Sequence, residues 1–332
     1  IVSWIVLKED FRVALASVEA ALSIQKSVGQ QNEGWTMFSS YVFCLCWHEH
    51  YESFIPRFEY AYQSALKFGK SEHAMWMLGA TLTLKYTMGK SLKSLVKEFQ
   101  PIVLIMEEHQ QTEQARLTKL KWQTIINITT GSGKGTNIEG SVSDSKEQTR
   151  DSSFFLGEVH WLEGEQLIAS SFEAAAERAV KHGDKYQKLC AGVFYNTIEL
   201  FHRGVALYAM ARKTKKRKYR KRAVKIRKTV KQWVQDGNPN IEHYDLLLDA
   251  EHAALNPKGY DMADDFYLRA IGSACRLGHL HHSALCNERY ADFLLNNRSD
   301  KTAALYRLSE SVRFYDEWGA VGKVNELKRQ MR

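Results

Sequence analysis

The stretch KEDFRVALASVEAALSI, residues 8–24, shows the pattern that decides the fold class. Its apolar side chains recur at the spacing i, i+3, i+4 and i+7, which places them on one face of an α-helix. The same spacing continues through most of the 332 residues, and strand-like alternation bounded by turn signals is nearly absent. The chain has only four prolines, so long helices can form almost everywhere. We therefore predict an all-α fold.

Short connections containing Gly, Asn or Asp separate the predicted helices. Short connections force consecutive helices to run antiparallel, so we expect a series of helix pairs. The periodicity predicts helices over residues 8–28, 33–48, 50–68, 71–88, 91–109, 111–129, 155–181, 185–211, 216–235, 240–255, 259–277, 279–296, 300–317 and 320–331.

A weak internal repeat suggests how these helix pairs stack. Small residues seven positions apart let a neighbouring helix approach closely, and an aromatic residue between them fills the gap between pairs. This arrangement is typical of a tetratricopeptide-like α-solenoid. An irregular helical bundle is the alternative, because seven-residue alanine spacing also occurs in any amphipathic helix. The pattern occurs at Ala263, Phe266 and Ala270, again at Ala169, Phe172 and Ala176, and in part at Ala304 and Ser311.

Residues 131–153, GSGKGTNIEGSVSDSKEQTRDSS, contain no aromatic side chain and only two large aliphatic ones. Such a segment cannot bury enough apolar surface to offset the entropy lost on ordering. We expect a disordered loop here, inserted between N-terminal helical repeats at 1–130 and C-terminal helical repeats at 154–332. The two sets of repeats are expected to form one continuous solenoid.

The loop begins with GSGKGT, which has the composition of a phosphate-binding loop but not its pattern. A P-loop has a glycine, four further residues, and then Gly-Lys followed by Ser or Thr. Here Ile128 occupies the first position and Gly135 follows Lys134. We therefore expect no nucleotide or other cofactor to bind at this loop.

Two groups of residues have the chemistry of metal ligands. The motif CLCWHEH at 44–50 brings cysteines and histidines together, but a helix would spread them around its axis, and zinc ligands usually come in two spaced pairs. His279, His281 and His282 fall in a predicted connection between helices, where we expect them to face solvent or to cap a helix. No nucleophile motif such as Gly-x-Ser-x-Gly occurs. We predict neither catalytic nor metal-binding residues, and no enzymatic activity for this chain.

The five cysteines are an odd number in a large chain and do not suggest a disulfide framework. No apolar run approaches the roughly 20 residues that span a bilayer, and no signal peptide pattern is present. We expect a cytoplasmic protein without a transmembrane segment. Because the sequence starts at Ile1 and runs directly into an amphipathic pattern, we also expect it to be part of a longer protein.

Positive charge is concentrated between Arg212 and Lys231, where 13 Lys and Arg residues occur without an acid. Without this run the net charge of +8 becomes 8 − 13 = −5. Such a run is usually a solvated surface, but it can also bind an acidic protein or domain, or the phosphates of nucleic acid or anionic lipid. We predict a packed helix in its second half, with apolar positions at Ala223, Val224, Ile226, Val230 and Trp233. The candidate partner-binding residues, called the basic patch below, are Lys213, Lys215, Lys216, Arg217, Lys218, Arg220, Lys221 and Arg222.

The C-terminal hundred residues contain four motifs in a specific order. They are NPNIEHYDLLLDAE at 238–251, ADDFYLRAI at 263–271, ALCNE at 284–288 and YDEWGAVGKV at 315–324. In order and spacing they resemble the helical-repeat region of large multidomain signalling ATPases. Those proteins combine a Ser/Thr-kinase-like domain, a STAND-type or Orc-like AAA ATPase and tetratricopeptide-like helices, often with a GAF domain and a sensor histidine kinase. Residues 1–230 share only the helical pattern.

The resemblance implies a regulatory segment that senses a partner or ligand and couples it to neighbouring ATPase or kinase domains. It implies no catalysis here, because no Walker motif, kinase catalytic loop or phospho-acceptor histidine box is present. Gly322 stands where the family tends to have alanine. We expect Gly319 to end one helix and Ala320 to start the next. The residues expected to carry the structural signature are Ala263, Tyr267, Ala270, Glu288, Tyr315, Trp318, Gly319, Ala320 and Lys323.

Overall fold

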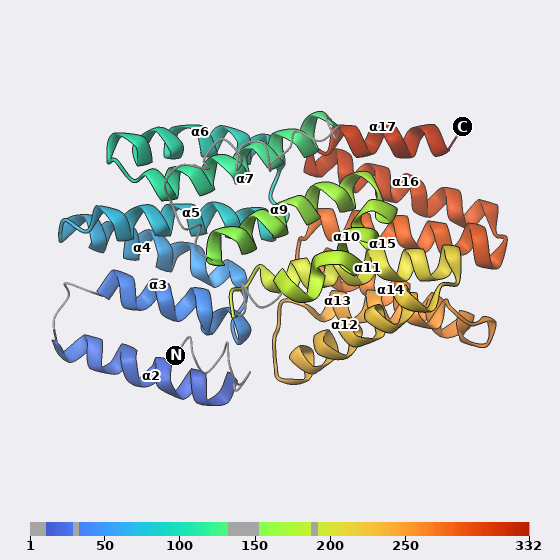
Figure 1. The fold of residues 1–332 in the computed structure, drawn as a ribbon, viewed down its shortest axis with the longest axis horizontal. Helices are drawn as coiled ribbons and strands as arrows, with labels where there is room; N and C mark the ends of the chain where they lie inside the picture. Colours follow the sequence, from blue (N-terminus) through green and yellow to red (C-terminus); the bar gives the residue numbers. More distant parts are fainter. Residues whose placement is uncertain (1–10, 29–32, 132–152, 187–191, 332) are drawn as a thin grey trace.

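The computed structural model describes residues 11–28, 33–131, 153–186 and 192–331, and all its regular elements within these ranges are helices (Figure 1). The predicted all-α fold is confirmed. The first part contains α2 (Phe11–Val28), α3 (Glu33–Phe43), η1 (Leu45–Trp47), η2 (Tyr51–Ser53), α4 (Phe54–Lys67), α5 (Ser71–Thr87), α6 (Leu92–Glu108) and α7 (Thr112–Thr130). The second part contains α9 (Ser153–Ser170), α10 (Phe172–Tyr186), α11 (Asn196–Thr214), α12 (Arg217–Gln235), α13 (Glu242–Ala253), η3 (Pro257–Gly259), α14 (Tyr260–Arg276), α15 (Leu280–Phe293), the π-helical turn η4 (Leu294–Arg298), α16 (Lys301–Trp318) and α17 (Val321–Gln330).

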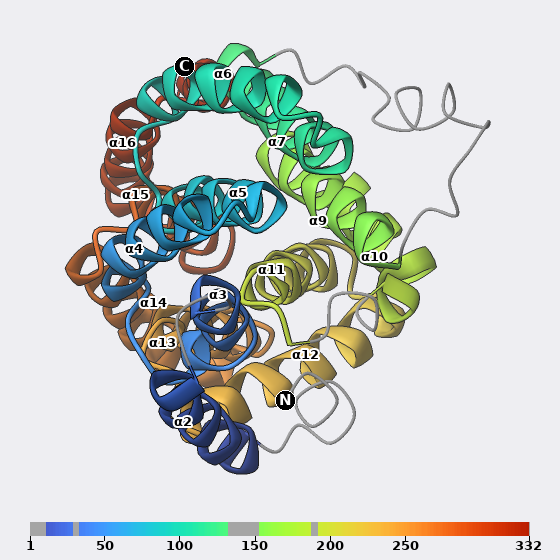
Figure 2. The same ribbon diagram turned by 90° about the vertical axis from the view of Figure 1, so that its left-hand side faces the viewer.

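Consecutive helices pack as pairs, among them α4 with α5, α6 with α7, α11 with α12, α13 with α14 and α15 with α16. Further contacts join α7 to the second part in a ring, in which α17 packs against α7, α7 against α9, and α9 against α10. The ring continues through α12, α13, α14, α15 and α16 back to α17 (Figure 2). Helix α11 contacts α9, α10, α12 and α13, and its residues from Asn196 to Arg212 are buried except the half-buried Glu199. It is therefore the central helix of this ring.

The ring closes where the end of α7 meets the start of α17. Gly131 ends α7 in the left-handed conformation, with φ of 70°. Its backbone lies against that of Gly322, so closely that neither residue has room for a side chain. This contact leaves room only for glycine at position 322.

We expect Gly322→Ala to lower the free energy of unfolding by about 1–3 kcal/mol, as overpacking does in a core. The new Cβ would meet the Cα of Gly131 and lie 2.8 Å from its nitrogen. Gly272→Ala in α14 is the matched control, because its Cβ would meet only Arg276 at an ordinary 3.5 Å. That change should stabilise the helix by about 0.5–1 kcal/mol. Urea unfolding of both variants and of the wild-type chain measures these effects. A Gly322→Ala variant as stable as the wild-type chain would contradict the close approach of Gly131 and Gly322.

Three predicted helices end or begin elsewhere in the structure. The helix predicted over 155–181 is two helices, because the Ser171 hydroxyl accepts a hydrogen bond from the Ala174 amide (3.2 Å) and caps α10. The helix predicted from 185 begins only at Asn196. Helix α3 ends at Phe43 and not at residue 48, and a 3₁₀ turn follows it.

A remote side chain holds the connection that follows α3. The Asn240 side-chain amide donates to the carbonyls of Cys46 (3.2 Å) and Glu49 (2.9 Å) and accepts from the Tyr51 amide (3.0 Å). These bonds satisfy backbone groups that a continuing helix would have paired internally. Because Asn240 lies about 190 residues away, the local pattern could not predict where α3 ends.

The small residues of the predicted repeat are buried in α14 and α16, but the motif predicted across α9 and α10 does not form. Ala263 and Ala270 are fully buried, but the aromatic side chain between them is Tyr267 and not the half-buried Phe266. In α16, the Ser311 hydroxyl donates to the Ala284 carbonyl (2.9 Å), which shows a close helix approach. The motif formed by Ala169, Phe172 and Ala176 does not lie on one face, since α9 ends before Phe172.

Apolar side chains from both parts of the described chain form one continuous buried cluster. Of the loop expected at 131–153, residues 132–152 lie outside the described residues. Within the ranges that the structure describes, no helix is both long enough and apolar enough to cross a bilayer.

Candidate functional site

A groove of about 1080 Å³ lies between the junction of α9 and α10, the end of α11, and α15, η4, α16 and α17. Six cationic and four acidic side chains line it together with apolar ones. The lining includes Phe172, Glu173, Met210, Arg212, Lys213, Lys215, Glu288, Arg289, Asp292, Leu295, Asn296, Asn297, Lys301, Leu305, Leu308, Lys323 and Glu326, and we call this site the groove.

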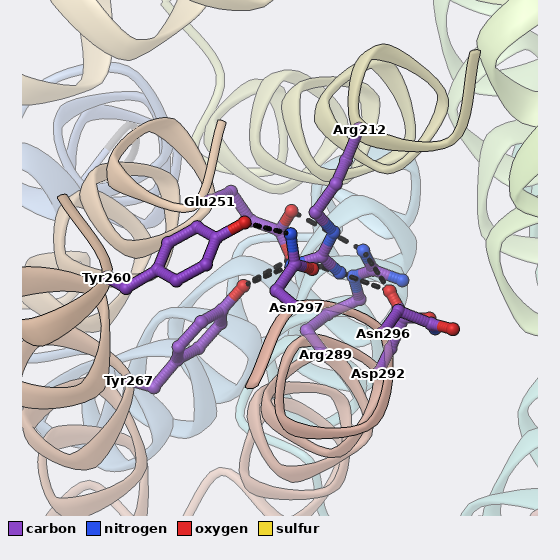
Figure 3. A network of polar contacts seen from close by, with 8 residues as sticks. All are labelled: Arg212, Glu251, Tyr260, Tyr267, Arg289, Asp292, Asn296 and Asn297. Atoms are coloured by element: carbon purple, nitrogen blue, oxygen red, sulfur yellow. Dashed lines mark hydrogen bonds and ion pairs between the residues drawn. The ribbon is translucent and has the colours of Figure 1, made fainter. Parts of the chain in front are cut away.

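Beneath the groove, two arginines and two carboxylates form a buried network (Figure 3). Glu251 of α13 accepts hydrogen bonds from Arg289 Nε (2.8 Å) and from the Tyr267 hydroxyl (3.0 Å). Asp292 pairs with Arg212 and also with Arg289, the latter at 3.1 Å. Arg212 further donates to the Tyr267 hydroxyl (3.0 Å) and lies 3.8 Å from Glu251. The four charges sum to zero.

Three members of the network, Arg212, Arg289 and Glu251, are buried, and Asp292 is partly exposed. Burial lowers the pKa of the Arg212 and Arg289 guanidinium groups, but Glu251 and the other carboxylates outweigh it and raise both pKa values. Burial raises the pKa of Asp292, and the attraction of Arg289 and Arg212 outweighs it and lowers that pKa overall. The two guanidinium groups and the Asp292 carboxylate are therefore held ionised in one geometry.

The π-helical turn η4 places two amides beside this network. Asn296 donates to the free oxygen of Asp292 (2.7 Å), and Asn297 donates to the Tyr260 hydroxyl (2.9 Å) (Figure 3). The extra residue in a π turn commonly re-aims side chains at functional sites. Here it turns both amides toward the groove.

A second ion pair joins α15 to α17. The two paired residues and a tyrosine hydrogen-bonded to one of them all belong to the predicted signature. Lys323 Nζ lies 2.8 Å from Glu288 Oε1, and the Tyr315 hydroxyl donates to Glu288 Oε2 (3.0 Å). The Phe172 ring lies between cations, 4.9 Å from the Arg289 guanidinium and 5.4 Å from Lys323 Nζ. The structure thus brings Glu288, Tyr315 and Lys323 together at the groove.

The rest of the predicted signature is structural. Gly319 ends α16 in the left-handed conformation with φ of 103°, and Ala320 is the residue before α17, as predicted. The side chain of Trp318 is buried beside the ring of His281.

The walls of the groove combine exposed leucines with a cationic rim. Leu295 and Leu305 are each 47% exposed. Lys213, Lys215 and Lys301 are exposed at the rim. The groove therefore offers fixed charges at its base and apolar surface at its walls.

The basic patch divides between two places. Lys213 and Lys215 line the groove, and Lys215 ends α11 with φ of 58°. The remaining members lie in or directly before α12, whose Tyr219, Ala223, Ile226, Val230 and Trp233 are buried, as predicted for a packed helix. Only part of the patch is paired, as between Lys218 and Glu177 (3.0 Å). The remaining members are Lys216, Arg217, Lys218, Arg220, Lys221 and Arg222.

A smaller hollow of about 460 Å³ lies between α10, α11 and α12, and we call it the basic hollow. Its lining holds four cations, Arg203, Lys221, Arg222 and Lys225, and no acid. Leucine, isoleucine and alanine side chains complete it. This surface suits an anionic group attached to an apolar one.

The prediction that His279, His281 and His282 face solvent is wrong. All three are at most 4% exposed, and they pack with His243 of α13. Residue 279 does precede α15, but its side chain makes no capping hydrogen bond. The helical periodicity could not predict this cluster, because histidines at the start of a helix are usually exposed polar residues.

The motif at 44–50 does not form a helix, since α3 ends before it. Cys44 and Cys46 are buried, and the Cys46 thiol donates to the Val42 carbonyl (3.3 Å). Among the described residues, the ligating side chains close enough to share one metal ion are His243, His279 and His282.

Sequence reasoning missed the centre of the groove. Arg212 was predicted only as part of a charge run, and Glu251, Arg289 and Asp292 were not predicted as site residues. A signal existed, since Glu251 and Arg289 each interrupt a largely apolar helix in LLLDAEHAAL and ALCNERYADF. Charged residues buried in that way need partners of opposite charge.

Comparisons of this chain with protein-family models, with curated proteins and with solved structures find no match.

Proposed function

We propose that this chain is a non-catalytic binding module, a tetratricopeptide-like α-solenoid segment whose groove receives a peptide segment of a partner protein. The carrying observation is a long groove whose base holds ionised side chains in fixed positions. Charges that are already ordered bind a partner without a further ordering cost. Stacked helix pairs typically present an extended concave surface for such binding.

The partner segment is expected to be amphipathic and acidic. The exposed Leu295 and Leu305 offer apolar contact that a partner side chain would bury, as when a helix lies in a groove. Cations outnumber acids in the lining by six to four, which favours acidic side chains on the partner. The rim lysines of the basic patch, Lys213 and Lys215, would then steer its approach.

Binding in the groove can affect neighbouring domains through helix α17. Helix α17 contributes Lys323 to the groove and also packs on α7 through Gly322 and Gly131. A partner that displaces α17 therefore strains the contact that closes the ring. This coupling supports a regulatory role beside the ATPase or kinase domains of a larger signalling protein.

We expect that replacing Leu295 and Leu305 together by aspartate weakens peptide binding by at least about thirtyfold, the effect of losing an interface hot spot of about 2 kcal/mol. The purified chain is screened against a peptide library, and the affinity of selected peptides is measured by calorimetry. Leu268→Asp is the matched control, since Leu268 is 45% exposed on α14 but outside the groove. Equal affinities for all three proteins would contradict the proposal.

A second candidate function is binding of phosphate groups, of nucleic acid or of an anionic lipid, in the basic hollow. The cations that α12 contributes to its lining, Lys221, Arg222 and Lys225, favour it. Adding the double variant Lys221→Glu/Lys225→Glu to the leucine variants separates the two functions. Loss of binding to RNA or to anionic vesicles in that variant alone would favour the second candidate.

A further inference from the structure

Five histidine side chains meet in the interior where α11, α13 and the start of α15 come together. They are at most 6% exposed. Neutral imidazole is the commonest metal-binding side chain in proteins, and a buried group of this kind has no role in the groove. The five are His202, His243, His279, His281 and His282.

Three of these histidines have the geometry of a metal site. His243, His279 and His282 each offer one ring nitrogen, and these nitrogens lie within 4.8 Å of one another. His243 Nε2 and His282 Nδ1 are 3.0 Å apart. In a tetrahedral zinc site with Zn–N distances of 2.0–2.1 Å, two ligand nitrogens lie about 3.4 Å apart. Small side-chain rotations therefore suffice to bring the three nitrogens to that spacing.

The same three side chains have ring nitrogens that no hydrogen bond satisfies. They are His243 Nδ1, His279 Nδ1 and His282 Nε2, each fully out of water. The other nitrogens of two of these rings, His243 Nε2 and His282 Nδ1, are bonded to each other and would exchange that bond for the metal. A buried polar atom without a partner destabilises a fold by about 1–3 kcal/mol. Burial also lowers the pKa of each imidazole, that of His279 to about 4, so the rings are neutral and keep the lone pairs that a metal needs.

A buried carboxylate stands next to the three rings. Glu165 is 3% exposed and lies 2.7 Å from His202 Nδ1 through its Oε1 atom. It also accepts from the Tyr86 hydroxyl (2.8 Å). The His202 ring contacts that of His282, with centroids 5.6 Å apart. The His202 imidazole thus separates the Glu165 carboxylate from the three rings.

We propose that His243, His279 and His282 bind one Zn²⁺ ion. Three protein ligands leave the fourth tetrahedral position for a water molecule. The ion would join α13 to the start of α15 near the end of α5, where Gly89 packs against His281. This proposal does not depend on ligand binding in the groove.

The test uses the full chain without a histidine tag. It is unfolded in guanidinium chloride with a chelator, and then refolded with Zn²⁺, with Co²⁺ or without metal. We expect one metal ion per chain by elemental analysis, the visible absorption of tetrahedral Co²⁺, and a higher Tm with Zn²⁺ than without. A wild-type chain that refolds, binds no Co²⁺ and shows the same Tm with and without Zn²⁺ would overturn the proposal.

Variants assign the ligands. His243→Gln, His279→Gln and His282→Gln should each lower the affinity for Zn²⁺ by at least about a hundredfold. Loss of a residue that only hydrogen-bonds to a metal ligand already lowers the affinity by up to about that factor. His281→Gln is the matched control, since His281 is equally buried in the same helix and stacks on Trp318. It should keep the metal. Loss of metal from His281→Gln as complete as from His279→Gln, with helical circular dichroism intact in both, would also overturn the assignment.

Discussion

Lowering the pH from 7.5 to 5.0 is expected to reduce the free energy of unfolding of the metal-free chain by about 2 kcal/mol for each deeply buried histidine. The four histidines concerned are His243, His279, His281 and His282. Burial lowers the pKa of each below the usual 6.5, that of His279 to about 4. Together they give the chain a strong dependence on pH.

The direction of this pH effect follows from proton binding in the folded and unfolded states. Between the folded pKa and about 6.5, the unfolded chain binds a proton that the folded chain excludes. Acid therefore favours unfolding, and the stability present above pH 6.5 is lost as the pH falls. For His279 the window runs from about 6.5 down to about 4, where the loss ends.

Urea unfolding at several pH values, in the presence of a chelator, measures this effect. His279→Gln should flatten the dependence between pH 6 and pH 5 by about 1.4 kcal/mol per pH unit, the contribution of one proton. His109→Gln is the control, because His109 is exposed at the end of α6 and should leave the slope unchanged. A wild-type chain equally stable at pH 5.0 and pH 7.5 would contradict the burial of these histidines.

Glu251→Ala is expected to lower the free energy of unfolding by about 3–5 kcal/mol. The carboxylate is 0% exposed, and its removal leaves Arg289 and Arg212 with only the partly exposed Asp292 as counter-charge. It also removes the acceptor of the Tyr267 hydroxyl. Two buried cations without enough negative charge are the main cost.

The experiment compares this variant with two further variants of the chain by chemical denaturation. Glu310→Ala breaks the surface pair with Arg313 (2.8 Å) and should cost no more than about 1 kcal/mol. Replacing Arg212, Glu251, Arg289 and Asp292 together by apolar residues of similar size should restore much of the stability, since it leaves no buried charge unpaired. If Glu251→Ala costs no more than Glu310→Ala, the network does not contribute as its geometry indicates.

The helices themselves were largely predictable. In α12, five buried side chains recur at helical spacing within a strongly basic segment, and the helix was predicted within one residue of its observed start at Arg217. Gly319 was predicted as the end of α16 because a glycine adopts the left-handed conformation at little cost. Such signals act within one or two helical turns, so the sequence contains them directly.

The candidate site was predicted only in part. The motif resemblance singled out Glu288, Tyr315 and Lys323, which meet at the groove. The role of Glu251 was missed, since a charge looks the same in sequence whether water or an arginine surrounds it. The helix start predicted at 279 was nearly correct, yet the expected exposure of its histidines was wrong.

The sequence by itself determined that the chain is helical and where most helices run, because helix formation depends on neighbours three and four residues away. Tertiary structure alone decided which polar side chains are buried and what they face. His243 and His282 are 39 residues apart, Arg212 and Asp292 are 80 apart, and Asn240 acts on the end of a helix more than 190 residues earlier. These contacts depend on how the helix pairs close around α11, and no local pattern encodes that closure.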